Sequence, residues 1–166
     1  LVLLLLDSGL RVGEAAALRR GDVDLAGGQI TVRDGKGGQG RTVYIFRACC
    51  QALDEYLVTH DDEAVFLGNS NGRPAPLTDS GIRQVLKRLA ARHGFDDLRP
   101  HTLRRTCGAE LVANGVDLRT VGDQFGHADV STTTIYTRLA DTRRREVLRR
   151  ASPVDRWPSS SPKTSS

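Results

Sequence analysis

The chain has 166 residues, of which 39% are hydrophobic and 27% are charged, which suits one soluble domain with a core of its own. Its opening run LVLLLL is too short to span a membrane and follows no basic region, which argues against a membrane span and a signal peptide. The three cysteines lack metal-ligand spacing and favour a reducing compartment without a structural metal, while the net charge of +4 permits a polyanionic partner.

The first half of the chain predicts short helices and a β-hairpin. We expect a helix over residues 1–6, interrupted by Ser8-Gly9, and a second helix from Val12 to about Arg19. The segments QITVRD (29–34) and RTVYIF (41–46) alternate apolar and polar residues around the glycine-rich GKGGQG, which is typical of a hairpin. A helix over 48–60, a strand over 64–68 and a loop over NSNGRPAP should follow.

The second half predicts a series of helices. The first, capped by Asp79 or Ser80, carries Arg83, Lys87 and Arg88 outside its apolar stripe. Further helices are expected near 102–113, from Asp117 to about Gly126, around Tyr136 and over 141–150. The fold class is therefore α+β and mainly α-helical, with a small antiparallel β-sheet or hairpin.

Basic charge gathers in this second half. Residues 1–82 hold 8 Lys/Arg and 11 Asp/Glu, a net charge of −3, whereas residues 83–150 hold 14 and 8, a net charge of +6. This distribution indicates a polyanion-binding face, although a solvated basic surface explains the charge alone equally well.

The glycine-rich segment GKGGQG (35–40) matches the GxGxxG pattern of dinucleotide-binding proteins. That fingerprint must lead from a strand into a helix, whereas this one leads into a second strand. The segment is also not a P-loop, because Gly-Lys-Ser/Thr does not follow at the required spacing. We interpret it as a hairpin tip, from which Lys36 could reach into a site.

Two pairs of residues lie at predicted helix starts. His101 and Arg104 are three apart and share a helix face, where free backbone N–H groups favour an anion and a guanidinium can bind two phosphate oxygens. Arg11 and Glu14 have the same spacing. Taken singly, each pair is explained more simply by a surface pair or a local ion pair.

Six side chains taken together favour phosphoryl transfer without a metal ion or another cofactor. Arginines neutralise the non-bridging phosphate oxygens, a lysine protonates the leaving alkoxide, and a phenol, with a pKa of roughly 10, attacks once a base removes its proton. The sequence contains neither an acidic metal-binding cluster nor HExxH. The candidate catalytic residues are Arg11, Lys36, His101, Arg104, His127 and Tyr136.

Three blocks carry a resemblance to the tyrosine recombinase (phage integrase) family. DSGLRVGEAAALRRGDVDL looks like its first-arginine block, ITVRDGKGGQGRTVYI like its lysine hairpin, and RPHTLRRTCGAELVANGVDLRTVGDQFGHADVSTTTIYTRL like its HxxR…GH…Y block. The likeness runs from Leu1 to about Arg150. Gln39 and Tyr44 stand where relatives often carry lysine and proline, and FGH replaces LGH, but no catalytic position of the motifs departs.

The resemblance implies a site-specific recombinase or integrase that cleaves and rejoins double-stranded DNA through a 3′-phosphotyrosine intermediate, without metal ion or ATP. It implies a homotetramer on synapsed DNA, a cytoplasmic location with the nucleoid and no membrane partner. Residues 1–150 would form the catalytic domain, without the core-binding domain that precedes it in the family. Residues 151–166 would form a disordered Pro/Ser-rich tail.

The resemblance also assigns a role to each candidate side chain. Tyr136 would be the nucleophile, Lys36 the general acid, Arg11 and Arg104 the phosphate clamp, His101 the aid to proton transfer, His127 a phosphate ligand, and Glu14 a supporting residue behind the site. The weak helix-forming residues Thr132–Thr134 would let the nucleophile move. Residues 141–150, with Val147 and Leu148 as their large apolar residues, would pack on a neighbouring protomer and be mobile in the isolated domain.

Three alternatives stay open at this point. The chain could be a DNA-binding remnant without activity in this form. It could be a type IB topoisomerase-like enzyme that relaxes DNA by the same chemistry without strand exchange. The third, a metal-dependent nuclease, lacks ligands in the sequence.

Overall fold

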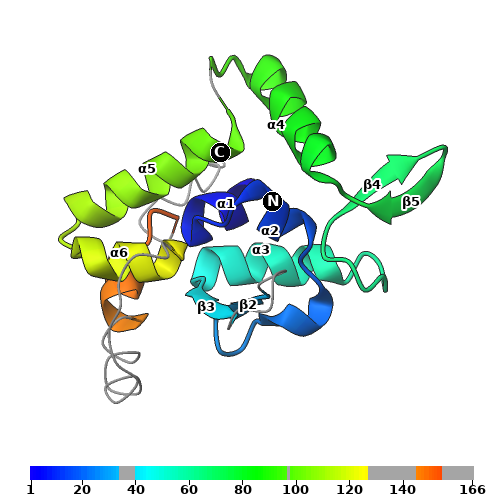
Figure 1. Cartoon of the computed structure of the whole chain (residues 1–166). Coiled ribbons are helices and arrows are strands. Elements are labelled where there is room, and N and C mark those ends of the chain that lie inside the picture. The colour runs from blue at the N-terminus through cyan, green and yellow to red at the C-terminus, as the bar shows by residue number, and fades with distance from the viewer. Residues whose placement is uncertain (34–39, 97, 127–144, 155–166) are drawn as a thin grey trace, which may run out of the picture.

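The computed structural model describes residues 1–33, 40–96, 98–126 and 145–154 (Figure 1). In this part of the chain no helix is long and apolar enough to cross a membrane. Residues 145–150 are helical. The other elements, in chain order, are α1 (Val2–Ser8), α2 (Val12–Ala16), the 3-10 turn η1 (Arg20–Asp22), β1 (Val23–Asp24), β2 (Gln29–Val32), β3 (Arg41–Tyr44), α3 (Arg47–Leu57), β4 (Leu67–Ser70), β5 (Arg73–Pro76), α4 (Asp79–His93), α5 (Pro100–Ala113) and α6 (Leu118–Phe125).

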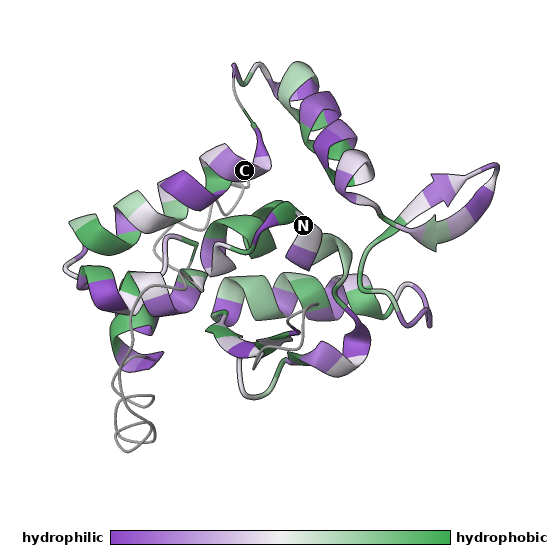
Figure 2. Ribbon diagram, in the orientation of Figure 1, coloured by the Kyte–Doolittle hydropathy of each residue, from purple (hydrophilic) through white to green (hydrophobic). Residues whose placement is uncertain are grey.

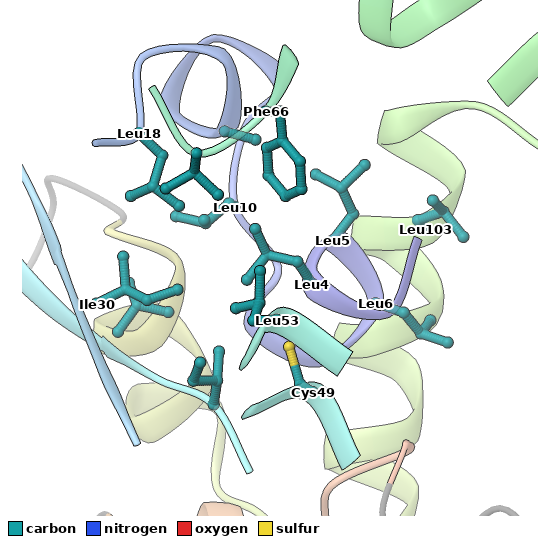
Figure 3. Close-up of a cluster of buried hydrophobic side chains, with 14 of the residues drawn as sticks. Leu4, Leu5, Leu6, Leu10, Leu18, Ile30, Cys49, Leu53, Phe66 and Leu103 are labelled. Atoms are coloured by element: carbon teal, nitrogen blue, oxygen red, sulfur yellow. The ribbon is translucent and has the colours of Figure 1, made fainter. Parts of the chain in front are cut away.

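Helix α1 is the centre of the main hydrophobic core. It packs against α3 and α5, and Figure 1 shows it between these two helices. Leu4 and Leu5 are buried among side chains from α3 and the strands, and Figure 3 shows them pointing toward Leu10, Leu53 and Phe66. Hydropathy follows the same arrangement, because α1 is mostly hydrophobic whereas α4 carries many hydrophilic residues (Figure 2).

The predicted hairpin is confirmed. Strands β2 and β3 pair antiparallel, with Ile30 opposite Val43, and both side chains are buried in the main core. Strand β1 joins the other edge of β2, so the sheet has a short third strand that the sequence pattern did not indicate.

The segment predicted to be a loop after residue 68 instead forms a second hairpin, in which β4 pairs antiparallel with β5. Its turn contains Asn71 and Gly72, with φ angles of 53° and 79°, and two successive positive φ angles suit the twist of a tight hairpin. Pro74 and Pro76 belong to β5, and an edge position tolerates residues that cannot donate to a ladder.

Side chains cap the N-termini of α4 and α6, and the capping residue of α4 differs from the prediction. Thr78, rather than Asp79 or Ser80, caps α4, and its hydroxyl accepts a hydrogen bond of 3.2 Å from the Gly81 N–H. Asp117 caps α6 as predicted and accepts a 2.9 Å bond from the Thr120 N–H.

Residues 145–154 pack on their own domain. Leu148 and Ala151 are buried in a second hydrophobic cluster together with Phe46. The Ser152 hydroxyl donates a 2.5 Å hydrogen bond to buried Asp7, whose other carboxylate oxygen accepts a 2.8 Å bond from the Phe46 N–H. The expectation that residues 145–150 do not dock within their own domain is therefore wrong, because small residues beyond the helix extend its apolar stripe. Packing on a neighbouring protomer stays a prediction. Residues 141–144 lie outside the described part, and residues 151–154 join the domain rather than the tail.

A buried glutamine connects β3 to two helices. The Gln124 side chain, on α6, accepts a 3.2 Å hydrogen bond from the Tyr44 N–H and donates a 2.9 Å bond to the Tyr44 carbonyl. Its amide also donates to the Ser8 carbonyl at 3.4 Å. The Gln124 amide thus makes the hydrogen bonds to Tyr44 that a neighbouring strand would otherwise make, and it holds α6 beside the end of β3.

Replacing Leu148 by Ala should lower the free energy of unfolding by about 2–5 kcal/mol, because it leaves a cavity in a packed cluster. Denaturant unfolding measures this change. Val58→Ala, at an exposed position of the chain, is the control and should change stability by less than about 0.5 kcal/mol. Equal effects of the two substitutions would contradict docking of residues 145–154 within the domain.

Replacing Gln124 by Leu should also destabilise the domain, although it makes the core more apolar. The change leaves the N–H and carbonyl of Tyr44 without their partner, at a cost of about 1–3 kcal/mol for each buried group. Denaturant unfolding should show a clear loss relative to Gln51→Leu, an exposed position on α3. A stability equal to that of the control would remove this structural role.

Candidate active site

The structure describes three of the six predicted catalytic residues. Arg11, His101 and Arg104 lie in the described part of the chain, whereas Lys36, His127 and Tyr136 lie outside it. Arg11 and Arg104 meet at a cluster that also contains Glu14, and they approach it from α2 and α5 respectively.

Arg11 occupies the position immediately before α2. Its backbone N–H donates a 2.7 Å hydrogen bond to Glu14, and its guanidinium forms a 3.2 Å ion pair with the same carboxylate. The guanidinium also lies 3.4 Å from the Gly126 carbonyl oxygen, at the end of α6. The Arg11 side chain remains 53% exposed, so an anion in solution can reach it.

Glu14 binds a second arginine more tightly. Its two carboxylate oxygens accept bonds of 2.8 and 2.9 Å from the two terminal nitrogens of Arg41, the first residue of β3. Both side chains are largely covered, with 21% of Arg41 and 16% of Glu14 exposed. Burial raises the pKa of Glu14, but the hydrogen bonds from Arg41 and from the Arg11 backbone outweigh it and hold this pKa below its ordinary value. The carboxylate is therefore ionised at neutral pH.

Arg104 joins the ends of two helices. Its guanidinium donates hydrogen bonds to the carbonyl of Gly9, after α1, and at 2.9 Å to the carbonyl of Phe125, in α6. It also lies 4.3 Å from the centre of the Phe125 ring, a cation–π contact. Burial and the nearby Arg11 and Arg41 charges lower the pKa of Arg104, yet a guanidinium stays charged throughout the physiological range.

Gly126 ends α6 between the arginines. It has a φ angle of 68°, and a Cβ atom there would lie 2.7 Å from the Arg41 guanidinium carbon. Both observations require glycine at this position. The glycine of the predicted GH motif therefore lies against the cluster, although His127 is outside the described residues.

His101 is placed differently from the arginines. It is exposed in the first turn of α5, one turn before Arg104. Among the described residues, none forms a hydrogen bond or an ion pair with it. His101 and Arg104 share a helix face, as their spacing predicts. Of the two, Arg104 alone belongs to the cluster among the described residues.

Sequence reasoning missed Arg41 and Gln124. Arg41 pairs with a carboxylate 27 residues earlier in the chain, and no local pattern connects these positions. Gln124 left a weaker signal, because it lies beside buried Val121 and Phe125 on α6. A polar residue on the apolar face of a helix indicates a buried hydrogen-bonding role.

The cluster is suited to binding a phosphate group. Among the described residues, Arg11 and Arg41 pair with the carboxylate of Glu14. The Arg104 guanidinium lies near enough for its charge to interact with those of all three. The excess positive charge is accessible at Arg11, and planar guanidiniums can each donate two hydrogen bonds to phosphate oxygens. Such donors stabilise the negative charge that develops during phosphoryl transfer.

Comparisons with known proteins identify the family of the chain. The sequence model of the phage integrase family matches residues 1–143. Tyrosine recombinase XerA of Thermococcus kodakarensis is 34% identical over 158 residues, which cover 94% of this chain and 56% of the relative. The chain spans about half the length of the curated relatives that it matches.

Solved structures show the same fold. The integrase from mycobacterium phage Brujita superposes with a TM-score of 0.72 at 30% identity, over 92% of this chain and 50% of that chain. The XerH site-specific recombinase bound to a palindromic difH substrate, a post-cleavage complex, gives a TM-score of 0.59 at 25% identity, over 87% and 43%. With the family match over most of its length, the chain belongs to the phage integrase family of tyrosine recombinases.

Proposed function

We propose that the chain is the catalytic part of a site-specific DNA recombinase that cleaves and rejoins strands through a 3′-phosphotyrosine intermediate. One observation carries the proposal: Arg11 and Arg104, the arginines of two family motifs, converge on one cluster in which Arg11 is open to solvent. Two guanidiniums from distant parts of the chain can together bind the non-bridging oxygens of a phosphodiester.

In the proposed reaction, Arg11 and Arg104 bind the non-bridging oxygens of the scissile phosphate. The phenol oxygen of Tyr136 attacks phosphorus, and the bond from phosphorus to the 5′ oxygen breaks. Lys36 gives a proton to the leaving oxygen, which becomes a 5′-hydroxyl. The hydroxyl of a partner strand later attacks the phosphotyrosine and releases the tyrosine.

The two histidines of the motifs complete the proposed assignment. His101 assists removal of the proton from the tyrosine, and His127 donates a hydrogen bond to the phosphate. The roles of Lys36, His127 and Tyr136 rest on their positions in the matched motifs. Since the phosphotyrosine ester retains the energy of the broken bond, the cycle needs neither ATP nor a metal ion.

We propose that double-stranded DNA lies along the basic side of α4. Arg83 and Lys87 on α4 line a groove of about 380 Å³ together with Arg99 and Pro100 at the start of α5. This groove leads toward the helix that carries His101 and Arg104. The named DNA complex of XerH supports DNA as the partner.

The same proposal extends to assembly and location. A homotetramer on synapsed DNA follows from reciprocal strand exchange, because four strands must be cut by four tyrosines. Access to that DNA implies a cytoplasmic, nucleoid-associated protein. Within the chain, the catalytic domain comprises residues 1–150 and the packed continuation to residue 154, and the Pro/Ser-rich tail follows.

Replacing Tyr136 by Phe should abolish covalent attachment to DNA and leave DNA affinity nearly unchanged, because only the hydroxyl is lost. A nicked suicide duplex, which releases a short strand after cleavage, traps the adduct for detection by denaturing electrophoresis. Tyr56→Phe removes the hydroxyl that accepts a hydrogen bond from the Leu67 N–H and should still form the adduct.

An adduct with the Tyr136→Phe chain would disprove the nucleophile assignment. Failure of the unaltered chain to form any adduct would favour the DNA-binding remnant. Relaxation of supercoiled DNA without recombinant products would favour the topoisomerase-like alternative.

DNA affinity should fall steeply with salt concentration, because each phosphate contact releases counterions and adds about −0.9 to the logarithmic slope. Replacing Arg83, Lys87 and Arg88 by Glu should flatten this slope in a filter-binding or anisotropy titration. Arg19→Glu, in the acidic half of the chain, should leave the slope close to its original value. An unchanged slope in the α4 variants would place the DNA on another face.

A further inference from the structure

Glu14 is shared unequally by two arginines. Arg41 binds both carboxylate oxygens, at 2.8 and 2.9 Å. The side chain of Arg11 makes one ion pair with the same carboxylate, at the longer distance of 3.2 Å. Arg11 is also the more exposed of the two, at 53% against 21%. Glu14 therefore has its main ion pair with Arg41 and a weaker one with the side chain of Arg11.

This inequality matters because Glu14 competes with an incoming phosphate for Arg11. A partly buried carboxylate needs a charged partner, and a bidentate guanidinium pair is the strongest arrangement available to it. If Arg41 did not fill that role, Arg11 could rotate to bind both carboxylate oxygens itself. Its guanidinium would then be neutralised and directed away from solvent.

The surroundings of Arg41 hold its guanidinium against Glu14. Each hydrogen bond that its side chain makes to a described residue goes to Glu14. Gly126 packs against the other side of the guanidinium, since a Cβ atom there would lie 2.7 Å from its carbon. Its backbone belongs to β3, which pairs along its length with β2. The guanidinium therefore has little freedom to leave the carboxylate.

We propose that Arg41 is a positioning residue that occupies Glu14 and thereby leaves Arg11 available to bind the scissile phosphate. The inference rests on the proposed function, in which Arg11 is part of the phosphate clamp. Arg41 acts through Glu14 and does not touch the phosphate. A lysine cannot replace it fully, because an ammonium group does not match both carboxylate oxygens at once.

The first test reads Arg11 directly and uses no DNA. Phenylglyoxal modifies accessible arginines, and peptide mass spectrometry quantifies modification at Arg11. The variant Arg41→Met keeps the length of the side chain and removes its charge. Modification of Arg11 should fall several-fold in this variant, because Glu14 now binds Arg11 with both oxygens. In the double variant Arg41→Met/Glu14→Gln it should return to the original level or exceed it.

A matched control comes from the other strand of the same hairpin. Arg33 follows β2 and pairs with buried Asp22 at 2.5 Å, much as Arg41 pairs with Glu14. Arg33→Met removes an arginine–carboxylate pair from the hairpin without touching Glu14, and it should leave Arg11 modification unchanged. Circular dichroism establishes that each variant is folded, and Arg41→Lys supplies a milder change if the methionine variant is not.

The second test measures single-turnover cleavage of the nicked suicide duplex. Arg41→Met should reduce the cleavage rate by about a hundredfold or more, the scale of losing one hydrogen-bond donor to the developing charge, with little change in duplex affinity. The added Glu14→Gln substitution should restore part of the rate. If Arg41 only stabilised the hairpin, the added Glu14→Gln substitution would not restore the cleavage rate, because removing the partner of Arg41 does not repair a distorted hairpin.

The two tests separate failure of this inference from failure of the proposed function. Arg11 modification that is equal in the unaltered chain and in the folded Arg41 variant overturns the inference, whatever the cleavage result. A chain that forms no adduct at all, but shows the expected loss and recovery of Arg11 modification, retains the role of Arg41 and removes the proposed activity. A cleavage defect that Glu14→Gln deepens also overturns the inference.

Discussion

The arrangement of the site depends on the hydrogen bonds that the Arg104 guanidinium donates. This guanidinium binds the carbonyl after α1 and a carbonyl of α6 while its own backbone lies in α5, so one side chain fixes three helices relative to one another. Gly9 makes this possible, since its φ angle of 65° turns the chain after α1 and a Cβ atom there would collide with the Phe125 ring. Arg11 follows two residues later, and its position is therefore set by the same contact.

Gathering Arg11, Arg41 and Arg104 near Glu14 costs electrostatic free energy, because like charges repel. Burial, together with the neighbouring guanidiniums, lowers the pKa of Arg104, which means that its charged form is less favoured here than in water. The domain offsets this repulsion with Glu14 and with backbone carbonyls, and the remaining positive charge is what attracts a phosphate. The same arginine charges thus favour phosphate binding and destabilise the free protein electrostatically, as is common in catalytic sites.

Local signals predicted much of this structure, and contacts between distant segments explain what was missed. The pairing of Arg11 with Glu14, the Asp117 cap and the β2–β3 hairpin each depend on residues a few positions apart. The β4–β5 hairpin was also encoded locally, by Asn71-Gly72, but the segment was predicted to be a loop. Arg41 with Glu14, Gln124 with Tyr44, and Ser152 with Asp7 join residues 27, 80 and 145 positions apart, and no periodicity in a single sequence connects such pairs.

The lysine hairpin shows how these distant contacts serve the proposed chemistry. Arg33 follows the last residue of β2 and Arg41 is the first residue of β3. Each arginine pairs with a largely buried carboxylate from the first 25 residues, Asp22 and Glu14 respectively. Both ends of the connection that carries Lys36 are therefore anchored to the part of the chain that holds Arg11. The two ion pairs thus fix Arg33 and Arg41, which flank the proposed general acid in the sequence, relative to the part of the chain that carries the phosphate clamp.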